Sequence, residues 1–152
     1  MGALRVVNKI WIFPPYEKDK VSIISVVERV EQRARYIRQS GPPGRFAIID
    51  FVIEPYEGGI VFENEARLQD DLRGDIEWEL AFPMVICSIY DGLKMFIQYK
   101  YNDSDLAIGN FKFKLKSLEI HKYDSKLTDF AIATTIGLNE IFISQKLSNQ
   151  ND

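Results

Sequence analysis

A Gly-Pro-Pro-Gly corner at residues 41–44 constrains the fold of this chain more than any other short stretch. It stands between "RARYIRQ", a basic run with alternating character, and "RFAIIDFVIEP", a nearly uninterrupted apolar run. Proline cannot sit inside a strand ladder, and glycine accepts the backbone angles of a turn. The pattern therefore predicts two antiparallel strands joined at the corner, the first from about Arg33 and the second ending at Pro55.

Other strand patterns occur on both sides of this hairpin. Strand-like runs are "LRVVNKIWIF", "VSIISVV" and "IVFENEA", and we interpret the last as the third strand of an antiparallel meander. The run "NFKFKLKSLEI" alternates Phe111, Phe113 and Leu115 with lysines, which predicts a half-exposed strand. Its outer face would then be basic through three residues: Lys112, Lys114 and Lys116.

The clearest helix pattern follows that strand, in "DSKLTDFAIATTIGLNEIFIS". Asp124 or Ser125 can cap its first turn, and an apolar stripe recurs at helical spacing. Small residues such as Gly137 would let it lie close to a sheet. We expect an N-terminal strand and loop over 1–20, one domain over 21–143, and a flexible tail over 144–152.

Residues 83–101 support two predictions. Asp91-Gly92 between apolar runs is a hairpin signal, which the local pattern favours slightly. Pro83 also suits a first helical position, and five apolar residues recur at helical spacing: Val85, Ile89, Leu93, Phe96 and Ile97.

The overall composition limits the class of protein. With 152 residues and 46% hydrophobic content, the chain has the balance of one globular domain. No continuous apolar run reaches the length of a membrane helix, and no signal peptide pattern begins the chain, so we expect a cytoplasmic protein without a membrane partner. The single cysteine, Cys87, lies in an apolar run and is expected to be a buried, inert thiol.

Charge is unevenly distributed along the chain. The net charge is −3, but residues 21–48 and 111–126 each carry +3 and residues 50–81 carry −8. The net charge argues against a simple nucleic-acid binder, and two short basic segments that flank an acidic one are equally well explained by ordinary surface charge. No phosphate-binding loop of the GxxxxGK[ST] type occurs, so we expect no nucleoside triphosphate, and we expect no metal or other cofactor.

The order of these motifs resembles domain IV of elongation factor G, a domain that tetracycline-resistance ribosomal protection proteins share. The resemblance rests on "RYIRQSG" with Gly44, "IEP" at Ile53–Pro55, "FEN" at Phe62–Asn64, His121, and "DS" at 124–125 before "FAIATTIGLNE". It implies an α+β two-layer sandwich of the ribosomal protein S five domain two type, mostly antiparallel, with two helices on one face. It also implies a left-handed β-α-β crossover, and so favours a helix over 83–101.

The resemblance further implies a non-catalytic role in which one end of the domain binds the ribosome or a structured RNA. The residues expected at that end come from the corner and from the loop that follows the lysine strand: Arg38, Ser40, Gly41, Pro42, Pro43, Gly44, Arg45, His121 and Lys122. Arginine and lysine would neutralise phosphates, and a tight glycine turn allows backbone to approach RNA closely.

This sequence departs from the family in ways that leave alternatives open. The corner is stiffer than the family's Gly-rich tip, and no G domain is present. A protein-interaction module that kept the fold and lost RNA binding is the main alternative. An enzyme is less favoured, because the carboxylates near Asp75 and the lone His121 lack the spacing of a nucleophile with its base.

Overall fold

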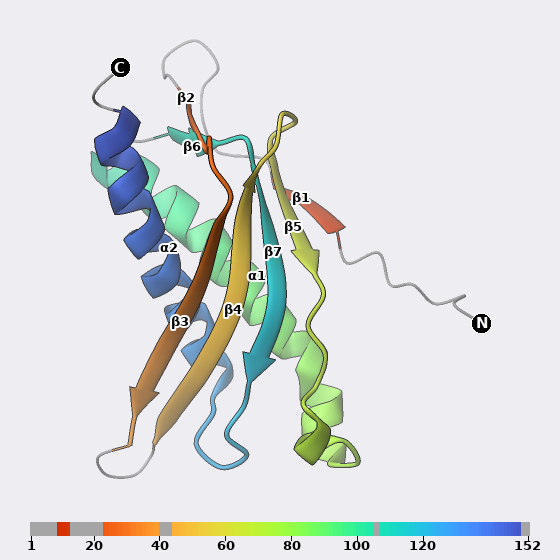
Figure 1. Ribbon diagram of the computed structural model, residues 1–152. Helices are drawn as coiled ribbons and strands as arrows, with labels where there is room; N and C mark the ends of the chain where they lie inside the picture. Colours follow the sequence, from red (N-terminus) through yellow and green to blue (C-terminus); the bar gives the residue numbers. More distant parts are fainter. Residues whose placement is uncertain (1–8, 13–22, 40–43, 105–106, 150–152) are drawn as a thin grey trace, which may run out of the picture.

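The protein is a two-layer α+β sandwich, in which one sheet carries both helices on the same face (Figure 1). The fold class expected from the sequence is confirmed. This computed structural model describes residues 9–12, 23–39, 44–104 and 107–149. The elements are, in chain order, β1 (Lys9–Ile12), β2 (Ile23–Ser25), β3 (Val30–Arg38), β4 (Arg45–Pro55), β5 (Ile60–Asn64), η2 (Asp70–Leu72), α1 (Ile76–Ser104), β6 (Ala107–Gly109), β7 (Phe111–Glu119) and α2 (Leu127–Asn149).

The main sheet has the strand order β1-β5-β7-β4-β3. The β3–β4 hairpin is confirmed, with β3 starting at Val30, but the three-strand meander is wrong because β7 lies between β4 and β5. The loop after β4 crosses the start of β7, where Tyr56 N donates to Asn110 O and Phe111 N donates to Gly59 O. Gly59 has a φ of 104°, which favours glycine. The N-terminal strand β1 pairs antiparallel with β5 at the edge.

The connection from β5 through α1 to β7 joins two parallel neighbours. Both strands run downward in Figure 1, α1 lies behind the sheet, and β7 lies to the left of β5, so the crossover is left-handed. Most such crossovers are right-handed, which makes this feature distinctive. The second sheet is a short parallel pair of β2 and β6.

Helix α1 settles the ambiguity over residues 83–101. The expected start at Pro83 is wrong, because Asp75 caps the helix by accepting a hydrogen bond from Trp78 N at 3.1 Å. The hairpin at Asp91-Gly92 is also wrong. Gly92 lies against α2, where a Cβ would stand 2.7 Å from the Ala131 carbonyl oxygen. This glycine therefore serves close helix packing rather than a turn.

Helix α2 lies close to the sheet, as its small residues predicted. A Cβ at Gly137 would stand 2.8 Å from Cβ of Ala34 on β3 and 2.9 Å from the Phe51 ring. Phe51 stacks on Phe113 at 4.5 Å between ring centroids, which extends the core across the sheet. The helix ends at Asn149, so it includes most of the residues assigned to a tail.

The start of α2 differs from the expectation. The helix begins at Leu127, and neither Asp124 nor Ser125 caps it. Instead the Asp129 carboxylate, in the first turn, accepts a hydrogen bond from Lys126 N at 2.9 Å. This is the return half of a capping box, in which the third helical residue reaches back to the residue before the helix.

Helix α1 is more apolar and more exposed than the sequence suggested. By length and composition the stretch Ile76–Lys100 could cross a membrane, since its mean hydropathy reaches 1.5 in an 18-residue window. A single such helix is weak evidence for a membrane span, because core helices pass the same test. The five residues predicted as its apolar stripe are buried, but Cys87 is exposed, so the expected burial of this thiol is wrong.

Candidate functional site

Two segments that are about 80 residues apart in the sequence meet at one end of the sandwich. We call this end the tip: the hairpin end from Arg38 to Arg45, and the loop and first helical turn from His121 to Asp129. Gln39 donates to the Asp124 carboxylate at 3.2 Å, and a Cβ at Gly44 would stand 2.5 Å from the Asp124 Cγ atom. Residues 40–43, which include the predicted Ser40, Gly41, Pro42 and Pro43, lie outside the described residues.

Ser125 joins the loop to the hairpin through two hydrogen bonds. Its buried hydroxyl donates to the Phe46 carbonyl at 2.6 Å and accepts from His121 N at 2.9 Å. The Phe46 and His121 rings lie 5.6 Å apart between centroids. These contacts hold the imidazole beside the end of β4, so the tip has a defined shape at this point.

Asp129 is the polar centre beneath the tip. Its side chain is fully buried, and it accepts hydrogen bonds from Phe46 N at 3.2 Å and Lys126 N at 2.9 Å. It also pairs with the Arg45 guanidinium at 3.1 Å. A buried carboxylate needs such partners to offset its loss of hydration. Asp129 therefore joins α2 to the hairpin and neutralises Arg45.

Arg38 and Arg45 face each other across the last register pair of the β3–β4 hairpin. Cross-strand neighbours have Cβ atoms about 4.5–5.5 Å apart, and like charges in this position are destabilising. Arg45 has Asp129 as a partner, but Arg38 is exposed and has no acidic partner within the described residues. The hairpin thus ends in a pair of arginines, with the Asp129 carboxylate on Arg45 and the Asp124 carboxylate beside Gln39 and Gly44.

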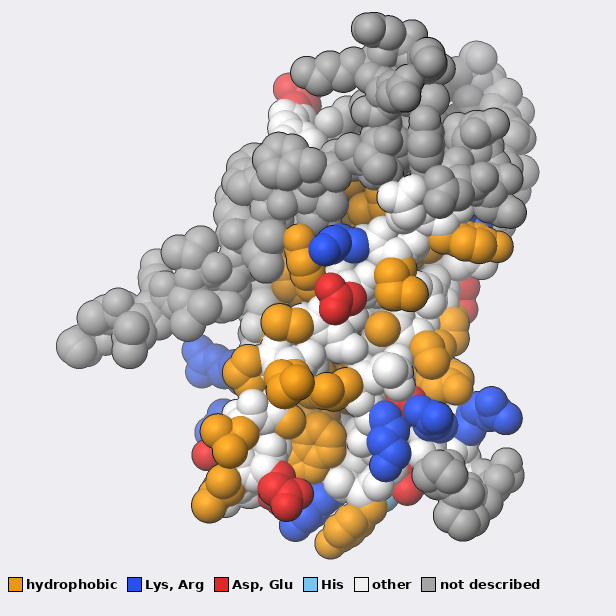
Figure 2. Space-filling model, turned by 180° about the vertical axis from the view of Figure 1, so that it is seen from behind, with side chains coloured by type: hydrophobic (Ala, Val, Ile, Leu, Met, Phe, Trp, Pro, Cys, Tyr) orange, Lys and Arg blue, Asp and Glu red, His pale blue; other side chains and the backbone are white. Residues whose placement is uncertain are grey.

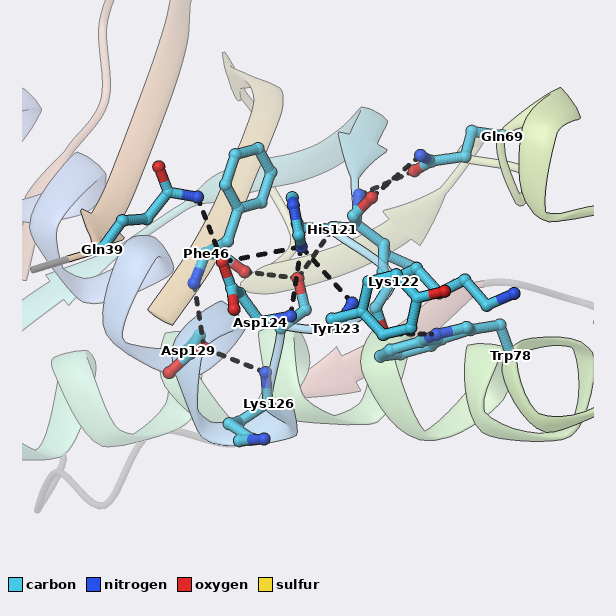
Figure 3. Close-up of polar contacts among 12 residues, drawn as sticks. Gln39, Phe46, Gln69, Trp78, His121, Lys122, Tyr123, Asp124, Lys126 and Asp129 are labelled. Carbon is cyan, nitrogen blue, oxygen red and sulfur yellow. Dashed lines mark hydrogen bonds and ion pairs between the residues drawn. The ribbon is translucent and has the colours of Figure 1, made fainter. Parts of the chain in front are cut away.

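His121 presents one ring nitrogen to solvent. Its Nδ1 accepts hydrogen bonds from Tyr123 N at 3.3 Å and Asp124 N at 3.1 Å, so the proton of the neutral ring lies on Nε2. Figure 3 shows this second nitrogen turned away from the contacts drawn. The side chain is 41% exposed. An N–H donor is therefore available at the tip, beside the Phe46 ring.

Lys122 is directed away from the arginine pair, toward the start of α1. Its Nζ pairs with Asp75 at 3.2 Å, and Trp78 Nε1 donates to its carbonyl at 3.2 Å. The backbone hydrogen bond from Trp78, followed by the bond from Lys122, lowers the pKa of Asp75. The bond to Asp75 in turn raises the pKa of Lys122. Lys122 thus fastens the tip loop to α1 rather than standing free.

The lysines of β7 do not form a separate basic patch. They share the outer face of the sheet as predicted, but each one pairs with a glutamate: Lys112 with Glu63 at 3.3 Å, Lys114 with Glu54 at 3.3 Å and Lys116 with Glu65 at 3.0 Å. Arg33 pairs with Asp50 at 3.4 Å on the same sheet. Lys112 is the second residue of β7, whereas the tip lies beyond the other end of this strand, about 30 Å away at strand spacing.

Several residues of the tip carried no recognisable signal in the sequence. Gln69 is one, because its side chain pairs with the backbone of Ile120 through two hydrogen bonds of 2.9 and 2.7 Å, and so extends the sheet toward the tip. Asp129 is another, since an acid in a first helical turn is common. Within the described residues, no group of three or more His, Cys, Asp or Glu side chains is arranged to hold a metal ion.

Comparison with known proteins identifies a shared fold. The chain is similar to a protein from Thermus thermophilus of known crystal structure, with a TM-score of 0.52 and 17% sequence identity. The match covers 76% of this chain and 16% of the Thermus chain, so this chain spans a small part of that protein's length. No family model matches the sequence.

Proposed function

We propose that the chain is a divergent form of the elongation factor G domain IV fold whose tip binds the ribosome or a structured RNA without chemistry. The α+β sandwich with its left-handed crossover supports the resemblance in fold. The motif order in the sequence supports the family, and the tip geometry supports the activity.

The observation that carries this proposal is the cross-strand pair of Arg38 and Arg45. Two cations opposite each other at the end of a hairpin repel, and Asp129 offsets only one of them. A phosphate placed between the two guanidinium groups would relieve that repulsion through charge-assisted hydrogen bonds. Such contacts position a protein on RNA without reading its sequence.

His121 adds a hydrogen-bond donor to the tip. Its Nε2–H would reach a phosphate or the edge of an unpaired base, and neighbouring Tyr123, which is exposed, would offer a ring for stacking. Three glutamates of the sheet face, Glu54, Glu63 and Glu65, are neutralised by the lysines of β7. The surface therefore suits a structured RNA with a protruding loop.

Co-sedimentation with ribosomes across a salt series tests the proposal. We expect binding that weakens as salt rises, because each phosphate contact releases counterions. Arg38→Glu should abolish it, and His121→Ala should weaken it. Arg35→Glu is the matched control, because it makes the same charge change on the same strand, but alternation places Arg35 on the opposite face of β3.

Two results would overturn the proposal. Equal loss in Arg38→Glu and Arg35→Glu would mean that net charge, not the tip, governs binding. Absence of binding even at low salt would remove ribosomal RNA as the partner and favour the protein-interaction alternative, for which the exposed apolar face of α1 is the specific observation.

A further inference from the structure

Helix α1 carries a second apolar stripe on the side opposite the core. Five large apolar side chains of this stripe are exposed by 56–73%: Ile76, Leu80, Met84, Met95 and Tyr99. They recur at helical spacing, and exposed Cys87 lies among them. Figure 2 shows hydrophobic side chains spread across this face of the molecule. Exposed Asp91 falls in the same helical row, between Cys87 and Met95, so the stripe is apolar toward both ends and carries one charge between them. Most large apolar residues of a globular protein are buried, so this exposed apolar surface indicates an interface.

The stripe is nearly symmetric about its own midpoint. Cys87 lies 11 residues after Ile76 and 12 before Tyr99, and 7 after Leu80 and 8 before Met95. When two copies of a helix lie antiparallel about a two-fold axis, each residue meets the residue equally far on the other side of that axis. An axis between Cys87 and Ser88 would set Ile76 against Tyr99 and Leu80 against Met95, and it would set Met84 against Asp91.

The two ends of the stripe are complementary in shape. Between α1 and α2, beside Met95 and Tyr99, lies a groove of about 550 Å³ whose lining includes Phe96, Thr135 and Ile136. The most exposed side chains of the stripe, Ile76 and Leu80, lie at the other end of the same helix. In the antiparallel arrangement Ile76 and Leu80 of each copy would enter the groove of the other copy.

The charges along α1 support the same arrangement. Its N-terminal end exposes Glu77 and Glu79, and its C-terminal half exposes Asp91 and Lys94. Antiparallel pairing brings the two glutamates of one helix toward Lys94 of the other, and it also opposes the two helix dipoles favourably. A parallel pair would place the two acidic ends together.

We propose that this face of α1 binds a second copy of the chain in an antiparallel, two-fold symmetric dimer centred between Cys87 and Ser88. The two tips would then lie at opposite ends of the dimer, because each tip adjoins the start of its own α1. The dimer is independent of RNA binding, and either proposal can fail alone.

Disulfide cross-linking through Cys87 tests this arrangement directly. Cys87 is the only cysteine, so any disulfide that it forms joins two chains. A disulfide needs Cα atoms about 4.4–6.8 Å apart, which an axis beside this residue allows. Mild oxidation of the full chain should therefore give a covalent dimer that reducing agent reverses, and a concentration series in analytical ultracentrifugation should give a monomer–dimer equilibrium before oxidation.

Substitutions separate this dimer from nonspecific association of exposed apolar surface. Leu80→Glu should raise the dissociation constant by roughly tenfold or more, because it acts at two symmetric places, and should slow the cross-link in parallel. Val27→Glu is the matched control, since Val27 is 65% exposed but lies between β2 and β3. Lys94→Glu should weaken the dimer, and adding Glu79→Lys should restore it.

Three outcomes would overturn the dimer. The first is a monomer at every concentration, and the second is a cross-link that forms as fast in Leu80→Glu as in the native chain. The third is binding to neutral phosphatidylcholine vesicles that Leu80→Glu abolishes while the chain stays monomeric in solution, which would assign the stripe to a lipid surface.

Discussion

The tip and the outer stripe of α1 are both exposed surfaces, but they are built in opposite ways. At the tip, polar groups from two distant segments satisfy one another, and Ser125 and Asp129 are buried beneath the surface. On the stripe, apolar side chains stand in solvent along one continuous helix. Directional hydrogen bonds fix the shape of the first surface, whereas helix geometry alone fixes the second.

This difference predicts opposite responses to salt. The proposed contacts of the tip with phosphate should weaken as salt rises, because counterions compete with the arginines. The proposed apolar association through the stripe should be insensitive to salt or be strengthened by salts such as sulfate. The two surfaces can therefore be tested separately in one preparation, and variants that act on one surface serve as controls for the other.

The largest expected effect comes from removing the buried carboxylate of the tip. Asp129→Ala would leave Phe46 N, Lys126 N and Arg45 without their shared acceptor, and we expect a loss of about 3–5 kcal/mol in the free energy of unfolding. Chemical denaturation measures this value. Asp129→Asn, which keeps the shape and one acceptor, should lose less, and an equal loss in both would show that charge is the whole contribution.

Two leucines of α1 give the next largest difference and sharpen the comparison. Leu93 is fully buried and Leu80 is 73% exposed. Leu93→Ala should cost about 2–5 kcal/mol because it leaves a cavity. Leu80→Ala should change stability by no more than about 0.5 kcal/mol in a dilute sample, where dimerisation does not contribute. A large effect at Leu80 under those conditions would place it in the fold of the monomer and weaken the case for an interface.

A smaller effect is expected at Gly44, where the two segments of the tip touch. An alanine Cβ would displace the Asp124 carboxylate, which is the end of a short and half-exposed side chain. We expect a loss below about 1 kcal/mol, partly offset by the lower flexibility of the unfolded chain. Amide chemical shifts should change at Gln39 and from His121 to Asp124 and remain constant on α1. Shifts that spread to the stripe would show that the two regions are coupled.

The sequence predicted the elements of this fold better than it predicted their order. Local patterns located β3, β4, β7 and α2, because alternation and helical spacing reflect burial directly. The position of β7 between β4 and β5 depends on pairing over long distances, which no local pattern records. The hairpin predicted at Asp91-Gly92 was wrong for a similar reason. A glycine that allows two helices to approach closely cannot be distinguished in the sequence from a glycine in a turn.

The candidate site was predictable only in part. The sequence predicted that Gly44, Arg45 and His121 lie at one end of the domain, and the structure places all three at the tip. It could not show that the lysines of β7 are neutralised, because their glutamate partners lie on β4, on β5 and just beyond β5. Nor could it show that Arg38 stands opposite Arg45, which depends on the register of the hairpin.

The smallest effect is expected where the tip meets α1, at Asp75 and Lys122. The folded pKa of Asp75 lies below its ordinary 3.8, so the contact stabilises the folded state above pH 3.8 and is lost as pH falls through the folded value. The folded pKa of Lys122 lies above its ordinary 10.5, so the contribution of this group is complete below pH 10.5 and is lost as pH rises through its folded value.

Trp78, whose indole donates to the Lys122 carbonyl, reports this contact by fluorescence in a Trp11→Phe background. We expect a change in emission in acid below pH 3.8. Asp75→Asn keeps a residue that caps helices well but removes the charge, so its emission should stay constant over the same range. A matching acid change in Asp75→Asn would assign the signal to other carboxylates.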